Sequence, residues 1–131
     1  MIGLDTNVLL RVLVDDGSPD VARARDFVAA QAQEGGDFFI DTVVLVETVW
    51  VLETVYGYER ADIGAAIDAI LGNAAYVVDG RETVAAALAR FRNGKADFSD
   101  CLIVARNAAA GCTGTASLDK AMRPLPGVIA P

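Results

Sequence analysis

Short apolar runs alternate with longer amphipathic segments along this chain. Residues Met1–Leu4 form an apolar run typical of a buried strand, and the run stops at Asp5, Thr6 and Asn7, which favour helix caps and turns. Beyond this stop, apolar residues recur at helical spacing over residues 8–13. The pattern predicts a first strand that ends on a carboxylate and leads directly into a first helix.

The same alternation continues to the end of the chain. Further strands are predicted over Phe38–Asp41 and Ala74–Asp79, with a fourth that ends near Ser117 and a short edge strand over Val128–Ala130. Helices are predicted from Ser18 to Gly35, over the run 42–58, over Glu59–Leu71, over Val84–Phe91, and from Asp97 or Ser99 to Gly111. This order, β-α-α-β-α-α-β-α-α-β-β, predicts a single α/β domain over residues 1–131. We expect a mainly parallel central sheet of four to five strands with helices on both faces.

The run TVVLVETVWVLETVYGY, residues 42–58, fits two kinds of element. Its β-branched residues suit a strand, whereas its length and the stop at Gly57 favour a buried helix, which we expect. Within it Glu47 has apolar neighbours on every side, so its side chain is expected to be at least partly buried. An ionised carboxylate there needs a compensating cation. A salt bridge to a buried arginine and a role as a metal ligand are the two interpretations.

The composition places the chain among ordinary globular domains. Its 131 residues are enough to bury a core without a disulfide or a structural metal. The chain opens with no secretory signal pattern, and its longest apolar run, around Val43–Leu52, is too short for a membrane span and carries Glu47. We therefore expect a soluble, cytoplasmic protein that does not enter a membrane. The only cysteines, Cys101 and Cys112, favour two buried thiols over a zinc site.

Histidine content and charge exclude several classes of function. The chain contains no histidine, which excludes Ser-His-Asp hydrolases, HExxH metalloproteases and nucleases that use an imidazole as base. The net charge of −7 argues against nucleic-acid binding through a broad basic surface. Any chemistry must therefore use carboxylates, and any contact with nucleic acid needs another source of positive charge.

Four acidic residues occupy positions that converge in an α/β fold. Asp5 and Asp119 follow predicted strands, Asp100 begins a helix, and Glu47 lies in the helix after the second strand. In an open sheet the ligand crevice lies outside the carboxyl ends of the strands, beside the switch in strand order where a first strand often lies. Carboxylates gathered there repel one another unless divalent cations lie between them. Carboxylate oxygens suit Mg²⁺ or Mn²⁺, and a pair of such ions can activate water in phosphodiester hydrolysis.

Each acidic position also has a purely structural interpretation. Aspartate is a preferred N-cap residue, so Asp5 alone is better explained as a cap, and Asp41 is expected to cap the following helix. Asp97 and Asp100 lie three residues apart and share the first turn of one helix, where a single cap suffices. Arg90 and Arg92 suit a solvated helix C-terminus, with phosphate contact as the alternative.

Taken together, four motifs carry a family resemblance. The segments LDTNVLLR, VETVWVL, ADFSDCLI and SLDKAM resemble, in order and spacing, the acidic motifs of PIN-domain ribonucleases, and most closely those of the VapC-type toxins of toxin–antitoxin pairs. At the fourth motif the chain reads Ser117-Leu118-Asp119 where such toxins commonly read Thr-Phe-Asp. The similarity spans nearly the whole chain.

The resemblance implies a PIN-like three-layer fold and a Mg²⁺- or Mn²⁺-dependent endoribonuclease with one or two ions per site. It further implies a homodimer and a cognate antitoxin protein that binds in the active-site groove. The acids of the quartet carry over as catalytic and metal-binding residues, with Asp5 and Asp100 holding the principal ion. Products with 5′-phosphate and 3′-hydroxyl ends are expected. The quartet is Asp5, Glu47, Asp100 and Asp119; the accessory residues are Thr6, Asn7, Asp97 and Ser117; the candidate RNA contacts are Arg11, Arg90 and Arg92.

Other classes of protein remain as alternatives. A phosphoacceptor receiver domain has a similar length and acidic pocket, but it needs adjacent acids after the first strand, where Asp5 is followed by Thr6 and Asn7. Asp79 ends the third strand without such companions. An aspartate-nucleophile phosphatase needs a second acid at position 7. A metal-free, non-catalytic acidic binding module is the third alternative.

Overall fold

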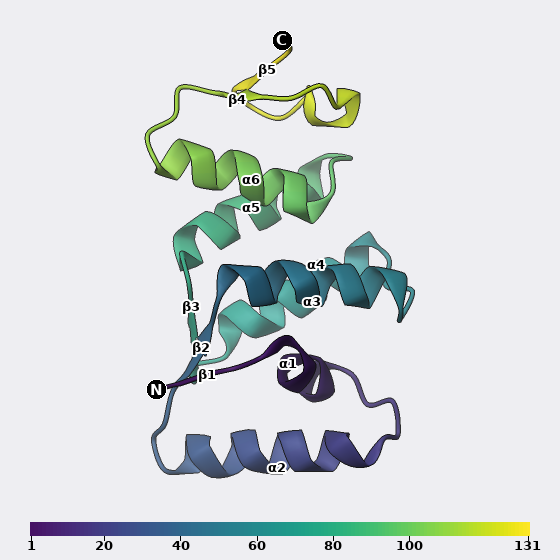
Figure 1. The fold of residues 1–131 in the computed structure, drawn as a ribbon, viewed down its shortest axis with the longest axis vertical. Coiled ribbons are helices and arrows are strands. Elements are labelled where there is room, and N and C mark those ends of the chain that lie inside the picture. Colours follow the sequence, from purple (N-terminus) through teal and green to yellow (C-terminus); the bar gives the residue numbers. More distant parts are fainter. The chain divides into compact units, whose positions relative to one another are not determined.

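Three parallel strands organise the N-terminal part of the chain in the computed structural model, which describes residues 1–131 (Figure 1). The strands β1 (Ile2–Gly3), β2 (Phe38–Ile40) and β3 (Tyr76–Val78) lie in the order β1-β2-β3. Phe38 pairs with Ile2 on one side and with Tyr76 on the other. The strands begin in register, so their carboxyl ends lie at one edge of the sheet.

Four helices complete this part of the chain. They are α1 (Thr6–Leu13), α2 (Pro19–Gln33), α3 (Thr42–Thr54) and α4 (Arg60–Gly72). In Figure 1, α1 lies between α2 and the pair formed by α3 and α4, and it packs against both α2 and α3. Helix α4 packs against α3 and β3. Together these elements form one compact unit, Met1–Asp79.

The ambiguous run around Glu47 is a helix, as its length and its glycine stop predict. Helix α3 buries Leu45, Val49 and Leu52, which recur at spacings of four and three and so share one helix face. Burial of this face against neighbouring elements overrides the β propensity of the valines in the run. The core of the unit consists of Leu4, Leu9, Leu10, Val21, Phe38, Ile40, Leu45, Val49, Leu52, Ile63, Ile67, Ile70, Tyr76 and Val78.

The second compact unit, Gly80–Pro131, is built on a pair of helices. Helices α5 (Arg81–Asn93) and α6 (Phe98–Ala109) pack against each other, and the rings of Phe91 and Phe98 meet edge to face with centroids 6.1 Å apart. The remaining elements are β4 (Thr115–Ala116), a short 3₁₀ helix η1 (Lys120–Met122) and β5 (Val128–Ile129). The 3₁₀ helix follows Asp119 and was not predicted from the sequence.

The strands form two sheets, which corrects the expectation of one sheet with four to five strands. Strands β4 and β5 are two residues long and pair in parallel with each other, apart from the three-stranded sheet. Backbone hydrogen bonds from Thr115 to Gly127 and from Ser117 to Ile129 extend this pairing. In the larger sheet β1 is an edge strand, so no switch in strand order lies beside Asp5 there. The α/β class, with six helices and parallel strands, is confirmed.

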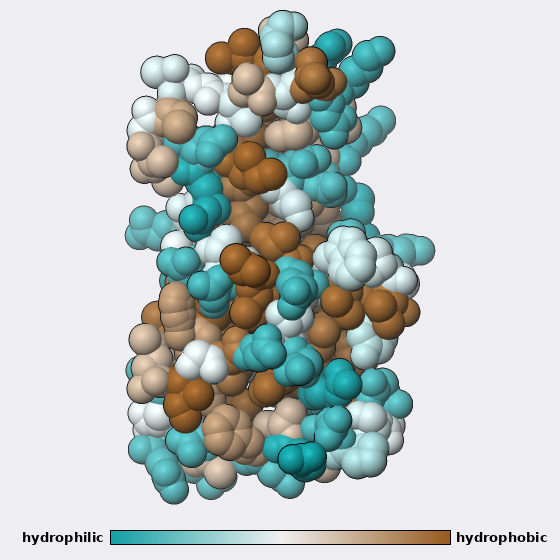
Figure 2. Space-filling view, in the orientation of Figure 1, coloured by the Kyte–Doolittle hydropathy of each residue, from teal (hydrophilic) through white to brown (hydrophobic).

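Several large hydrophobic side chains remain at the surface. Figure 2 shows hydrophobic residues exposed among hydrophilic ones on the face in view. Over the whole chain the exposed large hydrophobic residues include Val43, Trp50, Val55, Ile103, Leu118 and Ile129. None of the helices combines the length and the apolar character that crossing a membrane requires. Of the two cysteines, Cys101 is buried as expected, whereas Cys112 is exposed.

Candidate active site

Asp5 lies just beyond the carboxyl end of β1 and caps α1. Its Oδ1 accepts a hydrogen bond from the backbone N–H of Thr6 at 2.8 Å, and its carbonyl oxygen accepts hydrogen bonds from the amides of Val8 and Leu9. The Asp5 side chain is exposed, whereas Thr6 is buried. The cap is therefore confirmed, and it leaves the carboxylate accessible to a ligand.

Asp5, Asp41 and Asp79 follow the ends of three adjacent strands. The amide of Leu4 donates to Phe39 and the amide of Asp79 donates to Ile40, which extends the parallel pairing toward these acids. Asp41 caps α3 by accepting from the amide of Val43 at 2.6 Å, as expected. Asp79 Oδ2 accepts from the hydroxyl of Thr42 at 3.0 Å. Asp41 and Asp79 are thus engaged in fixing the start of α3.

Glu47 is exposed, which corrects the expectation that it would be at least partly buried. The buried face of α3 carries Leu45, Thr48 and Val49, and Glu47 lies outside that face. Trp50, one turn further along the helix, is 61% exposed. Apolar neighbours in the sequence did not bury Glu47, because a helix presents consecutive residues in different directions. No buried salt bridge is therefore needed to explain this carboxylate.

In the C-terminal unit Asp97 and Asp100 are joined by a helix cap. Oδ1 of Asp97 accepts a hydrogen bond from the backbone N–H of Asp100 at 2.8 Å, so Asp97 is the N-cap of α6. Partial burial, the charge and hydrogen bonding of Asp97, and the charge of Asp119 raise the pKa of Asp100 to about 6. The structure thus brings Asp97, Asp100 and Asp119 close enough for their charges to interact.

Asp119 is held in a short turn by Ser117. The Ser117 hydroxyl oxygen accepts from the amide of Asp119 at 3.0 Å, and the same hydroxyl donates to Met122 Sδ at 3.2 Å. Asp119 caps the 3₁₀ helix by accepting from the amide of Ala121 at 2.9 Å. Leu118, which stands where VapC-type toxins commonly carry an aromatic residue, is 82% exposed. The presence of leucine in place of an aromatic residue at position 118 therefore does not affect the packing of the core.

The chemistry of these side chains fits a divalent cation. Asp5 and Glu47 belong to the N-terminal unit, and Asp100 and Asp119 belong to the C-terminal unit. Within neither unit do three or more acidic or cysteine side chains form a group with the spacing of a metal site. All candidate ligands are carboxylates, the donors that Mg²⁺ and Mn²⁺ prefer. A cation beside Asp100 would offset the like charges that raise its pKa.

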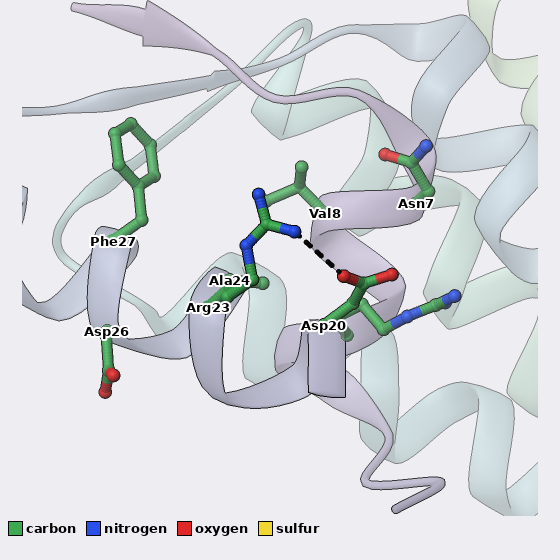
Figure 3. A pocket seen from close by; sticks show the side chains of 8 residues that line it. Asn7, Val8, Asp20, Arg23, Ala24, Asp26 and Phe27 are labelled. Carbon is green, nitrogen blue, oxygen red and sulfur yellow. Dashed lines mark hydrogen bonds and ion pairs between the residues drawn. The ribbon is translucent and has the colours of Figure 1, made fainter. Parts of the chain in front are cut away.

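The candidate RNA contacts lie on two helices. Arg11, on α1, lines a pocket of about 710 Å³ formed with α2, and Asn7 lines the same pocket. Arg90 and Arg92 are exposed on α5, and Arg90 lines a smaller pocket of about 340 Å³ in its own unit. The larger pocket is drawn in Figure 3.

The sequence did not single out two further residues of the larger pocket, Arg23 and Phe27. Both residues lie on α2 and point toward the pocket in Figure 3. Their spacing of four residues is the signal that puts them on one helix face. Only Val21 is buried in α2, so the helix has a wider exposed surface than its pattern suggests.

Comparison with known proteins agrees with the motifs. The model of the PIN domain family matches residues 2–126. The chain is 30% identical over 99 residues to a protein named VapC ribonuclease from Aquifex aeolicus (strain VF5), which covers 76% of this chain and 73% of that relative. The family match extends through both compact units. This chain therefore belongs to the PIN domain family.

Proposed function

We propose that this chain is a divalent-metal-dependent endoribonuclease that acts as the toxin of a toxin–antitoxin pair. The observation that carries the proposal is the occurrence of four acidic motifs, in order, within a PIN domain match that covers residues 2–126. The similarity to a VapC ribonuclease supports RNA as the substrate. The match across both units supports a single functional domain over the chain.

Asp5, Glu47, Asp100 and Asp119 are the proposed catalytic carboxylates. Asp5 and Asp119 each use one carboxylate oxygen in a helix cap, which holds the side chain in a defined position. The side chain of Asp97 accepts a hydrogen bond from the backbone amide of Asp100, and the Ser117 hydroxyl accepts one from the backbone amide of Asp119. Hydrogen bonds of this kind help to orient carboxylates that bind a metal ion. Thr6 and Asn7 follow Asp5 at the start of α1 and complete the proposed accessory set.

A bound Mg²⁺ or Mn²⁺ supplies Lewis acidity toward the phosphodiester and lowers the pKa of water. The carboxylates must be ionised to bind it, and the raised pKa of Asp100 makes this residue the one most sensitive to acid. In a chain without histidine, Asp100, whose pKa is raised to about 6, is a candidate group for accepting a proton. We expect products with 5′-phosphate and 3′-hydroxyl ends.

The decisive experiment is cleavage of a mixed pool of structured RNA by antitoxin-free protein, with Mg²⁺ or Mn²⁺ compared with EDTA. Asp5→Asn and Asp100→Asn are tested beside wild type. Asp41→Asn is the matched control, because Asp41 also follows a strand and caps a helix but lies outside the quartet. Asparagine is a good N-cap, so the control keeps the fold of α3.

Metal-dependent cleavage that is lost in the Asp5 and Asp100 variants and kept in the Asp41 variant is the expected result. Loss in the Asp5 and Asp41 variants, with cleavage kept in the Asp100 variant, would instead locate the site at the strand ends occupied by Asp5, Asp41 and Asp79. Folded protein that binds RNA without cutting it, with or without metal, would favour a non-catalytic binding module.

The proposed partners are a second copy of the chain and a cognate antitoxin. The exposed side chains of Val43, Trp50 and Val55 on and beside α3 are available for such contacts. Light scattering of the purified chain tests for the homodimer. Co-purification with the product of the neighbouring gene, and loss of RNA cleavage when that product is added, test for the antitoxin.

A further inference from the structure

The pocket between α1 and α2 is lined in part by α1, the helix that the proposed catalytic Asp5 caps. Its cavity measures about 710 Å³, within the range of sites that hold small ligands. Asn7 and Arg11, which line it, lie two and six residues after Asp5. A ligand in this pocket therefore lies next to the helix that Asp5 caps.

Arg11 contributes a buried donor that has no acceptor. Its Nε is inaccessible to water and makes no hydrogen bond, and its guanidinium forms no salt bridge, although its charge contributes to lowering the pKa of Asp16. The backbone carbonyl of Arg11 is held by Arg25 Nε at 3.1 Å, which fixes the main chain at this position. A buried guanidinium nitrogen without a partner is costly, and an anion such as phosphate offers the acceptors that it lacks.

Helix α2 adds a second cation and an aromatic ring. Arg23 and Phe27 lie one turn apart, and both point toward the pocket in Figure 3. Arg23 pairs with Asp20 at 3.3 Å, but both side chains are largely exposed, so this ion pair exchanges readily for another anion. Phe27 is 43% exposed and meets Phe38 edge to face, with centroids 6.3 Å apart. The contact with Phe38 fixes the ring while part of it stays accessible.

We infer that the α1–α2 pocket binds one nucleotide of single-stranded RNA, an inference that rests on the proposed ribonuclease function. Arg11 and Arg23 bind the phosphate, and the base stacks on Phe27. The amide of Asn7 offers both a donor and an acceptor to the edge of the base. The strand must be single, because a paired base cannot leave its stack to meet an aromatic side chain. The pocket thus gives an acidic protein a local cationic contact for RNA.

Binding and cleavage of a short labelled single-stranded oligoribonucleotide test this inference. Binding is measured by fluorescence anisotropy in EDTA, which separates it from cleavage. The variants are Arg11→Gln, Phe27→Ala and Phe27→Leu, the last of which keeps an apolar contact with Phe38 but removes the aromatic face. Arg81→Gln is the control, because Arg81 is exposed and carries the same charge outside this pocket.

We expect each pocket variant to weaken RNA binding by roughly tenfold and to raise KM with little change in kcat, whereas Arg81→Gln changes neither by more than about twofold. An oligonucleotide scanned with single abasic sites should show one position where base removal weakens binding to wild type but not to Phe27→Leu. Such coupling is not expected if Phe27 has only a structural role.

Unchanged RNA binding in the folded pocket variants, or the absence of any abasic position coupled to Phe27, would overturn the inference. RNA cleavage by wild type together with this outcome leaves the proposed nuclease intact. Conversely, RNA binding that depends on Phe27 in a protein that never cleaves RNA would support the pocket and contradict the nuclease.

Discussion

The carboxylate of Asp97 accepts a hydrogen bond from the backbone amide of Asp100 at 2.8 Å, so the residue that caps α6 also sets the position of a second acid. The two side chains share the first turn of the helix, and Asp119 adds a third negative charge nearby. A helix N-terminus tolerates negative charge well, yet the pKa of Asp100 rises to about 6. Partial burial and like charges therefore outweigh the favourable helix dipole.

The raised pKa of Asp100 predicts a pH-dependent effect on the stability of metal-free protein. Because the folded state binds this proton more tightly than the unfolded state, ionisation of Asp100 destabilises the fold as pH rises from 3.8 through 6. Relative to wild type, Asp100→Asn should therefore be more stable well above pH 6 than well below pH 3.8, by about 1 kcal/mol or less after screening. Thermal unfolding in EDTA across this range checks the prediction. A difference that does not vary with pH would contradict it.

Removal of the Asp97 cap should be visible in both stability and titration. Asp97→Ala should lower the free energy of unfolding by about 1 kcal/mol, because α6 loses its side-chain cap, while Asp97→Asn should cost much less. Both variants should also lower the pKa of Asp100, since they remove a neighbouring charge. Urea unfolding measures the first effect and NMR titration of the carboxyl groups measures the second. Equal stability of the two variants would argue against the cap.

Gly114 should not tolerate a side chain. A Cβ at this position would lie 2.6 Å from Ile129 Cδ1 and 2.8 Å from the carbonyl oxygen of Gly127, which is backbone of the loop before β5. Gly114→Ala should therefore destabilise the β4–β5 pair by about 1–3 kcal/mol. Gly72→Ala is the matched control, since a Cβ there meets nothing within 4 Å and alanine favours the end of α4. Chemical denaturation distinguishes the two, and similar stability would show that the loop relaxes.

Loss of the hydroxyl should lower the stability of the protein at one buried threonine, Thr115, but not at the other, Thr48. Thr48 is fully buried in α3 and its Oγ1 has no hydrogen-bond partner, so Thr48→Val should leave stability unchanged or raise it by about 1 kcal/mol. The hydroxyl oxygen of Thr115 accepts from Asn107 Nδ2 at 3.0 Å, so Thr115→Val should cost about 1–2 kcal/mol. Thermal unfolding of both variants at one pH is sufficient. A destabilised Thr48→Val would indicate a partner for this hydroxyl.

Much of the local structure could be read from the sequence because it depends on neighbouring residues. The caps at Asp41 and Asp97 require only a side chain that reaches an amide two or three positions on. The helix over the ambiguous run around Glu47 follows from its length and from apolar residues that recur at helical spacing. The order of the acidic motifs was likewise visible in the sequence, although the catalytic roles assigned to them stay predictions.

Exposure and strand pairing could not be read in the same way. Glu47 lies among apolar residues in the sequence but is exposed in the helix, and Phe27 belongs to an apolar pattern yet keeps much of its ring at the surface. Which face of a helix is covered depends on elements far away in the chain. Strands β4 and β5 pair with each other and do not join the three-stranded sheet. The sequence does not show this choice, because the backbone donors and acceptors of a short strand can pair with any free strand edge.

The sequence by itself determined the succession of elements, the helix caps and the acidic character of the candidate site, since each follows from local spacing and side-chain chemistry. Only the tertiary structure decided that Asp100 shares its surroundings with Asp97 and Asp119, and that Arg11, Arg23 and Phe27 line one pocket. Those relationships arise when separate helices and turns pack together. Packing depends on the shapes of whole surfaces and not on the spacing of residues along one segment.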